Sequence, residues 1–261
     1  MPDAEALAQD AQLLGDAVRD GGALAMSVLR RDIRKWTKPD GSQVTEADLA
    51  VNDLLAERLR SARPGYGWLS EETPDRDERL ARERVWIVDP IDGTSDFAAG
   101  GSDWCIAVAL VAHGQPIAAA VYRPVHDEFY VAVQGGGAAV NGKALSVADA
   151  PSLQGASIMG NRKSLAGLMS AGIDARSRAT LPLQLRLSHV AAGHLHGAVS
   201  IGPRNDWDLA AGDLLVREAG GRVTDTRGAA YVYNRPQTWQ QGLVAAGAKR
   251  HAAIMEALRT T

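Results

Sequence analysis

The stretch that most constrains the fold is residues 86–94, which read Trp-Ile-Val-Asp-Pro-Ile-Asp-Gly-Thr. Residues 85–88 are apolar and partly β-branched, and the run is too short for a helix, so it predicts a buried strand. Because proline cannot donate a ladder hydrogen bond, we expect this strand to end at Asp89. Asp89 and Asp92 would then lie at the end of the strand and in the turn beyond it.

The residues in and after this turn suit metal-assisted phosphate chemistry. Carboxylates such as Asp89 and Asp92 hold hard cations. The backbone N–H groups of Gly93 and Thr94, in a turn or at the start of a helix, suit an anion. Pro, Asp, Gly and Thr also form ordinary turns, so this stretch alone leaves both interpretations open.

Length and composition indicate a soluble globular protein. A chain of 261 residues, 46% hydrophobic and 23% charged, can bury a core as one large domain or two modest lobes. The net charge of −3 does not favour a nucleic acid polymer or an acidic membrane as partner, and no apolar run approaches the roughly 18 residues of a membrane helix. The single cysteine and an acidic N-terminus without a signal-peptide pattern predict a cytoplasmic protein.

The hydrophobic periodicity predicts alternating helices and strands. We expect helices near residues 4–31, 45–62, 184–194, 205–219 and 248–258, and strands near 66–70, 85–88, 104–111, 116–122, 129–133, 157–160 and 197–201. Gly21-Gly22 interrupts the first helix and weakens that prediction. The glycines at 135–137 lack the ending of a Walker loop, and with Asn141-Gly142 they predict hairpin turns.

Acidic residues recur at three other places, and each has a structural explanation when taken alone. Thr45 and Asp48 have the spacing of a helix capping box. Glu71-Glu72 follows a predicted strand, where adjacent acids are usually solvated. Asp208 lies in the first turn of a predicted helix, where the helix dipole favours acids.

Taken in order, these elements resemble the inositol monophosphatase family over about residues 4 to 250. The resemblance rests on Thr45-x-x-Asp48, Glu71-Glu72, the Asp-Pro-Ile-Asp-Gly-Thr run and Trp207-Asp208-x-Ala210-Ala211-Gly212. The family contains magnesium-dependent, often lithium-sensitive phosphatases, including 3'(2'),5'-bisphosphate nucleotidases. It implies an α/β (α+β) fold, a layered αβαβα sandwich of the inositol monophosphatase and fructose-1,6-bisphosphatase type. An N-terminal lobe of residues 1–145 would carry most metal ligands, and residues 146–261 would complete the site.

The resemblance also assigns roles at a site with two to three Mg²⁺ ions. Glu71, Asp89 and the carbonyl of Ile91 would bind one ion, and Asp89, Asp92 and Asp208 a second. A third, weaker ion would lie near Glu71.

The remaining catalytic and binding roles follow from the same resemblance. Asp48 and Thr94 would orient the attacking water, with Glu71 also counted as catalytic. Gly93 and Thr94 would hold the phosphate by their amides, next to Ser95. Hydrolysis would proceed by direct attack of a metal-activated water, without a phospho-enzyme.

The substrate is a small phosphorylated metabolite whose identity the sequence leaves open. Ile201 stands where inositol-specific members have a glutamate, and Ser95-Asp96 departs from both the inositol phosphatase and the nucleotidase pattern. Lys38 matches a family lysine, and its neighbourhood favours a bisphosphate nucleotidase. For a second phosphate the candidates are Arg204, Arg162 and Lys163, each of which is equally well explained as solvated surface.

Other functions and the assembly state stay open. The alternatives are an inositol-1-phosphate phosphatase, a histidinol-phosphate or fructose-bisphosphate phosphatase and, from a different class, a non-catalytic metal- and phosphate-binding relative. The resemblance implies a homodimer.

Overall fold

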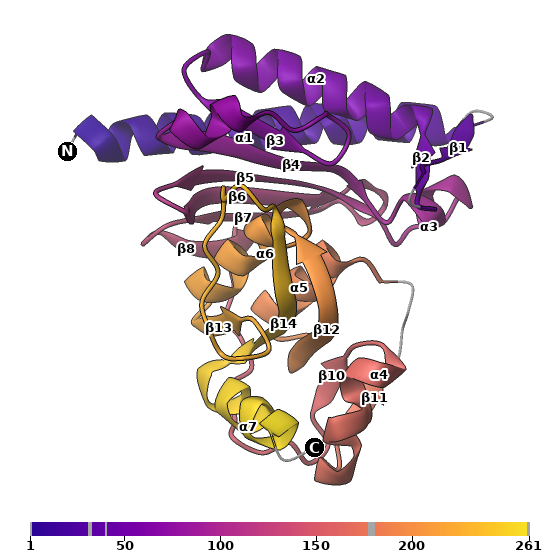
Figure 1. Cartoon of the computed structure of the whole chain (residues 1–261), viewed down its shortest axis with the longest axis vertical. Coiled ribbons are helices and arrows are strands. Elements are labelled where there is room, and N and C mark those ends of the chain that lie inside the picture. The colour runs from indigo at the N-terminus through magenta and orange to yellow at the C-terminus, as the bar shows by residue number, and fades with distance from the viewer. Residues whose placement is uncertain (1, 31–32, 40, 177–180, 260–261) are drawn as a thin grey trace.

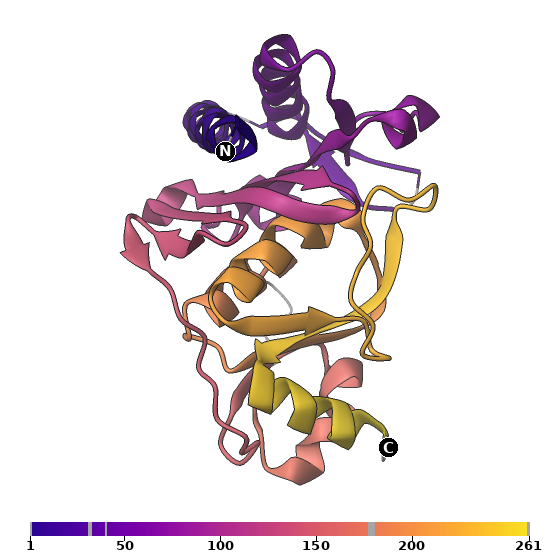
Figure 2. The same cartoon turned by 90° about the vertical axis from the view of Figure 1, so that its left-hand side faces the viewer.

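The computed structural model describes residues 2–30, 33–39, 41–176 and 181–259, and five layers stack along its long axis (Figure 1). Helices α1 and α2 form the first layer, a seven-stranded sheet the second, α5 and α6 the third, a five-stranded sheet the fourth, and α4 with α7 the last. The order of layers is the same after a 90° turn, where α1 is seen nearly end-on (Figure 2). The predicted αβαβα sandwich is confirmed.

The helices of the described residues include the five that were predicted, each close to its predicted position, and two short ones that were not predicted. They are α1 (Pro2–Leu29), α2 (Glu46–Ala62), α3 (Thr94–Ala98), α4 (Arg162–Leu165), α5 (Leu183–Ala191), α6 (Asp206–Glu218) and α7 (Ala248–Arg259), with 3₁₀ turns η1 (Asp77–Ala81), η2 (Pro124–His126) and η3 (Ala166–Ala171). The predicted end of the first helix at Arg31 lies outside the described residues. Within the described ranges, we find no helix that combines the length and the apolar character needed to cross a membrane.

Glycine does not interrupt α1, and the packing of the helix explains why. A Cβ atom added to Gly22 would lie 2.5 Å from two ring carbons of Tyr122 on β6. The missing side chain therefore lets α1 approach the sheet closely, and this contact outweighs the unfavourable helix propensity of glycine.

The seven-stranded sheet is built from one continuous part of the chain and has the order β3-β4-β5-β6-β7-β8-β9. Its strands are β3 (Gly67–Ser70), β4 (Arg84–Asp92), β5 (Cys105–Ala112), β6 (Gln115–Arg123), β7 (Glu128–Val133), β8 (Gly137–Val140) and β9 (Lys143–Ala144). Only β3 and β4 pair in parallel. The two hairpin turns predicted at the glycines after β7 and β8 are confirmed.

The second sheet has the order β11-β10-β12-β14-β13, and a small hairpin of β1 (Lys35–Thr37) and β2 (Gln43–Thr45) precedes α2. The strands of this sheet are β10 (Ser157–Met159), β11 (Asp174–Arg176), β12 (Gly197–Asn205), β13 (Gly221–Thr224) and β14 (Trp239–Gly247). The sequence reasoning missed β14, which pairs with β12 and β13. The division of the chain at residue 145 stays a prediction.

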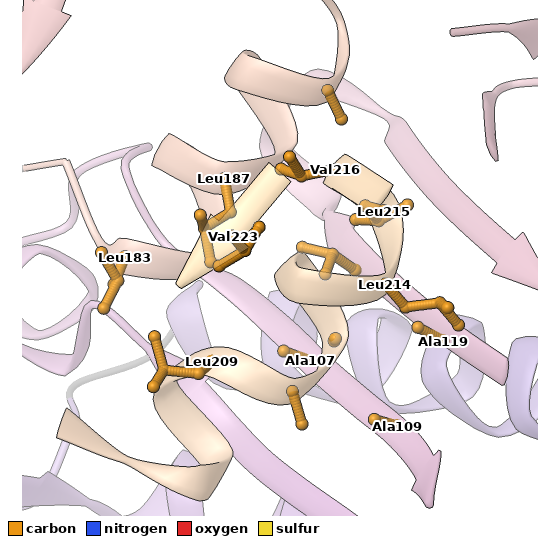
Figure 3. Close-up of a cluster of buried hydrophobic side chains, with 14 of the residues drawn as sticks. Ala107, Ala109, Ala119, Leu183, Leu187, Leu209, Leu214, Leu215, Val216 and Val223 are labelled. Carbon is orange, nitrogen blue, oxygen red and sulfur yellow. The ribbon is translucent and has the colours of Figure 1, made fainter. Parts of the chain in front are cut away.

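The largest core cluster fills the space between the two sheets, around α6 (Figure 3). Leucines 209, 214 and 215 of α6 are buried against alanines 107 and 109 of β5 and Ala119 of β6. These alanines leave room for α6 to lie close to the first sheet, so that the start of α6 reaches the end of β4. A second cluster joins α1 and α2 to the outer face of that sheet, and a third lies under α7.

Candidate active site

Strand β4 does not end at Asp89 as predicted, but continues through Pro90 to Asp92. Its parallel ladder with β3 ends at Val88, so the ladder needs no backbone N–H from Pro90 on that side. On the other side the register with β5 is irregular between Asp89 and Asp92. A proline is tolerated at such a bulge because the ladder is already interrupted there.

The bulge places Asp89 and Asp92 on the same face of the sheet. Residues three apart point to opposite faces of a regular strand. Here Asp89 pairs with Ala107 and Asp92 with Cys105, so three steps on β4 match two steps on β5. Ala107 and Cys105 both face the core between the sheets, where α6 lies. The extra residue therefore turns both carboxylates toward Asp208.

Most of the predicted site residues line one cavity of about 740 Å³. Its predicted members are Glu71, Asp89, Ile91, Asp92, Gly93, Thr94, Ser95 and Asp208. The β1–β2 turn, the start of α3 and the start of α5 complete its wall with Gly41, Ser42, Gln43, Asp96, Leu181, Pro182 and Arg186. The four predicted carboxylates, which come from three distant parts of the chain, thus meet at the junction of the two sheets.

Asp48 lies directly behind this cavity and has two sets of contacts. Its Oδ2 accepts hydrogen bonds from the backbone N–H of Thr45 at 2.8 Å and from the Thr45 hydroxyl at 2.6 Å, so the predicted capping box is confirmed. Its Oδ1 lies 2.8 Å from the hydroxyl of Thr94, which is also 3.0 Å from the carbonyl oxygen of Ile91. Burial raises the pKa of Asp48. The residue therefore caps α2 and also contacts the site.

The pKa values of the buried carboxylates are raised, as is expected where several acids lie close together. Burial raises the pKa of Asp92 to about 7 and that of Asp208 to about 6. The pKa of Asp89 is raised well above its usual range by burial and by the charges of Glu71, Asp92 and Asp208. Oδ1 of Asp89 is buried and has no hydrogen-bond partner among the described residues. An unpartnered buried carboxylate oxygen is costly, and a hard cation would satisfy it.

Backbone N–H groups hold one carboxylate oxygen of Asp92 and one of Asp208 in place. Oδ2 of Asp92 accepts from the backbone N–H of Gln184 at 2.7 Å, and Oδ2 of Asp208 from that of Asn205 at 2.8 Å. Across the described ranges, no three Asp, Glu, His or Cys side chains are gathered tightly enough to form a ready-made metal cage. The donor set is oxygen-rich and fits Mg²⁺, which keeps several waters and needs only a few carboxylates.

Lys38 lies against acids rather than in the open part of the cavity. Its Nζ is 3.0 Å from Oε1 of Glu71 and 2.6 Å from Oε1 of Glu72. Burial alone would lower the pKa of Lys38, but the two carboxylates raise it. Lys38 is therefore a counter-ion of a predicted metal ligand.

The arginines and the lysine predicted to meet a second phosphate lie outside the carboxylate cavity. Arg204 donates from Nη2 to the hydroxyl of Ser200 at 2.7 Å and lines a smaller neighbouring cavity. Arg162 and Lys163 are exposed on α4, in the outermost layer (Figure 1).

Arg186 is the cation that the sequence reasoning missed. It lies on α5, whose first turn binds Asp92 through Gln184, and it lines the carboxylate cavity. Its Nε donates to the carbonyl of Leu181 at 2.6 Å, which fixes the guanidinium. Burial lowers the pKa of Arg186, while the charge of Asp92 favours its charged form. The available signal was a single cation between the apolar residues Leu185 and Leu187 of a buried helix.

Comparison with known proteins decides the family. The model of the inositol monophosphatase family matches residues 7–261. The chain belongs to the inositol monophosphatase family. Family members are phosphatases, so this protein is a phosphoric monoester hydrolase.

Individual relatives agree with the family match. The chain is 37% identical over 203 residues to the inositol-1-monophosphatase of Mesorhizobium japonicum, covering 73% of this chain and 75% of that protein. It is 30% identical over 235 residues to the Nus factor SuhB of Pasteurella multocida, covering 81% and 83%. The crystal structure of the extragenic suppressor protein suhB of Bartonella henselae superposes with a TM-score of 0.84 at 26% identity, covering 96% and 98%. This similarity extends over all five layers.

Proposed function

We propose that the protein is a Mg²⁺-dependent phosphomonoesterase that hydrolyses a small phosphorylated metabolite by direct attack of water. The observation that carries this proposal is the convergence of Glu71, Asp89, Asp92 and Asp208 on one cavity. A purely structural cluster would not leave a buried carboxylate oxygen of Asp89 without a partner, as it is in the part of the chain that the structure describes.

The predicted ligand set would hold two ions that share Asp89. Glu71, Asp89 and the carbonyl of Ile91 would hold one ion, while Asp89, Asp92 and Asp208 would hold another. Magnesium, when bound, supplies positive charge that polarises the phosphoryl group and the attacking water. The carboxylates supply the geometry, since β4, β3 and α6 fix their positions.

The chain's own groups orient the nucleophile and bind the phosphate. The Thr94 hydroxyl and Oδ1 of Asp48 form a hydrogen-bonded pair at the cavity wall. This pair would orient the water and accept its proton, and burial, which raises the pKa of Asp48, makes it a stronger base than an exposed aspartate. The backbone amides of Gly93 and Thr94 would bind phosphate oxygens, with Ser95 beside them.

We infer that the substrate carries a second anionic group, as 3'(2'),5'-bisphosphate nucleotides do. Arg186 supports this because its fixed guanidinium lines the cavity without a protein carboxylate bonded to it in the described ranges. Arginine binds phosphate with paired donors. Ile201 adds support, since its exposed apolar side chain cannot bind inositol hydroxyls. Inositol 1-phosphate and histidinol phosphate are the competing substrates.

The test compares phosphate release from adenosine 3',5'-bisphosphate, inositol 1-phosphate and histidinol phosphate, with Mg²⁺ and with EDTA. We expect Mg²⁺-dependent release with the highest kcat/KM for the bisphosphate, and almost none in Asp92→Asn. Arg186→Gln should raise KM for the bisphosphate roughly tenfold or more and leave the monophosphates unchanged. Turnover in EDTA would refute the proposal, and a preference for inositol 1-phosphate would refute the substrate assignment.

The rival from another class is a non-catalytic relative that binds metal and phosphate. It predicts Mg²⁺ binding without turnover of any of the three substrates, and Asp48→Asn without effect on its function. We also propose a homodimer, as is common in the family, and a cytoplasmic location, as the single cysteine suggests. Sedimentation equilibrium tests the homodimer and cell fractionation tests the location.

A further inference from the structure

A second cavity, of about 380 Å³, lies where β12 ends and β14 begins. Its lining residues are Pro203, Arg204, Asn205 and Trp239. The two strands are held together here, because Asn205 pairs with Trp239 in the ladder and Arg204 pairs with Gln240. The volume is within the range of small-molecule sites.

This cavity shares a wall with the carboxylate cavity. The backbone N–H of its lining residue Asn205 donates to Oδ2 of Asp208 at 2.8 Å. Asn205 therefore lies between Asp208 and the second cavity.

The side chains in this cavity suit a flat aromatic ring. Trp239 is 42% exposed, although it belongs to a strand whose last six residues are buried. Arg204 is held in place by the hydroxyl of Ser200, which lies 3.1 Å from Nε and 2.7 Å from Nη2. An indole and a fixed guanidinium are the groups on which nucleobases stack.

The backbone under Trp239 is fixed independently of its indole. Its carbonyl accepts from Nη2 of Arg235 at 2.9 Å, and the neighbouring carbonyl of Thr238 accepts from the N–H of Asp206 at 2.6 Å. Replacement of the indole therefore removes the ring surface without removing these hydrogen bonds.

We propose that this cavity is a subsite for an aromatic ring in the leaving group of the substrate, with Trp239 and Arg204 as the stacking groups. The inference rests on the proposed phosphatase function and deepens it. It requires a substrate with a phosphate at the carboxylates and a planar ring, such as a nucleobase, at the end of β14.

The experiment measures kcat/KM of the full-length protein with Mg²⁺ for adenosine 3',5'-bisphosphate, which has an aromatic ring, and inositol 1-phosphate, which has none. Trp239→Ala should lower kcat/KM for the nucleotide about tenfold or more, mainly through KM, and leave inositol 1-phosphate unchanged. Trp239→Phe should restore most of the loss. Met169→Ala, at an exposed apolar residue on η3, is the control and should change neither.

The outcomes separate the two proposals. Absence of turnover with every substrate would refute the phosphatase proposal itself. Turnover of both substrates with equal losses in Trp239→Ala, or with no loss, would refute the aromatic subsite alone. A shift of the oligomeric state in Trp239→Ala, with nucleotide kinetics unchanged, would assign the indole to contact with a second copy of the chain and overturn the inference.

Discussion

The hydroxyl of Thr94 lies 2.8 Å from Oδ1 of Asp48, and this contact joins the start of α2 to the turn after β4. The other oxygen of the same carboxylate caps α2 through Thr45. One carboxylate therefore links the stability of a helix to the position of the hydroxyl that we propose orients the attacking water. Substitutions at the two contacts separate these roles.

We expect Asp48→Asn to lower kcat by about 100-fold or more, because the amide is not a base, while Mg²⁺ affinity stays unchanged. Thr45→Ala is the matched control, since it removes a capping hydroxyl and leaves the Asp48–Thr94 contact. It should cost about 1 kcal/mol of unfolding free energy with little change in kcat. Steady-state kinetics and urea unfolding measure both, and equal losses of kcat would contradict the assigned role of Asp48.

Lys38 would compete with the proposed metal for Glu71, because its Nζ lies 3.0 Å from that carboxylate. Lys38→Gln should tighten Mg²⁺ binding roughly three- to tenfold, since it removes a positive charge from the site. Lys35→Gln, on the exposed face of β1, should leave the affinity unchanged. Calorimetric titration with Mg²⁺ gives the result, and weaker binding in Lys38→Gln would show that the ammonium assists the site instead.

The packing of α1 makes opposite predictions for two glycines of the same helix. Gly22→Ala should destabilise the protein by about 1 to 2 kcal/mol, because the added methyl would meet the Tyr122 ring at 2.5 Å. At Gly15 the nearest atom is Cζ of Phe129 at 3.4 Å, so Gly15→Ala should be neutral or stabilise by up to about 1 kcal/mol. Denaturant midpoints compare them, and a stabilising Gly22→Ala would contradict the close approach.

Acid should destabilise the fold through His251, whose Nε2 lies 2.9 Å from the hydroxyl of Thr224. Burial lowers the pKa of His251 from 6.5 to about 4. Between these values the unfolded chain binds a proton that the folded chain does not, so stability falls as the pH falls. From pH 7.5 to 5 this group should contribute a loss of about 1 to 2 kcal/mol, with allowance for solvent screening.

His251→Gln isolates this contribution from the titration of the buried aspartates. Urea unfolding of both proteins at the two pH values gives the comparison. The variant should lose less stability on acidification than the natural chain. An equal loss in the two proteins would remove His251 as a cause.

The periodic parts of the fold were predictable, and the irregular parts were not. The helix from Asp206 to Glu218 and the buried strand from Cys105 to Ala112 have strong local patterns, and both were found. Strand β14 was missed because its first half reads Trp-Gln-Gln-Gly, which lacks an apolar pattern and contains a glycine with positive φ. Its place in the sheet depends on pairing with β12, a non-local interaction.

The acids of the site were predictable only because their order resembles that of a known family. Nothing local to Glu71 or Asp208 distinguishes them from a solvated or capping residue. Arg186 was missed for the converse reason, since its role depends on α5 pointing its first turn at Asp92. Gln184, the residue of that turn that bonds Asp92, follows it by 92 residues in the sequence. Such proximity arises only when both sheets are packed.

The register irregularity in β4 makes the site depend on residue number as well as residue type. If one residue between Asp89 and Asp92 were deleted, the strand would pair with β5 without interruption. The two aspartates would then be two residues apart and would still face the same side of the sheet. The second carboxylate would then be drawn back along the strand, away from the N–H of Gln184 that now holds it. Within this stretch we therefore expect a one-residue deletion or insertion to reduce activity more than most substitutions do.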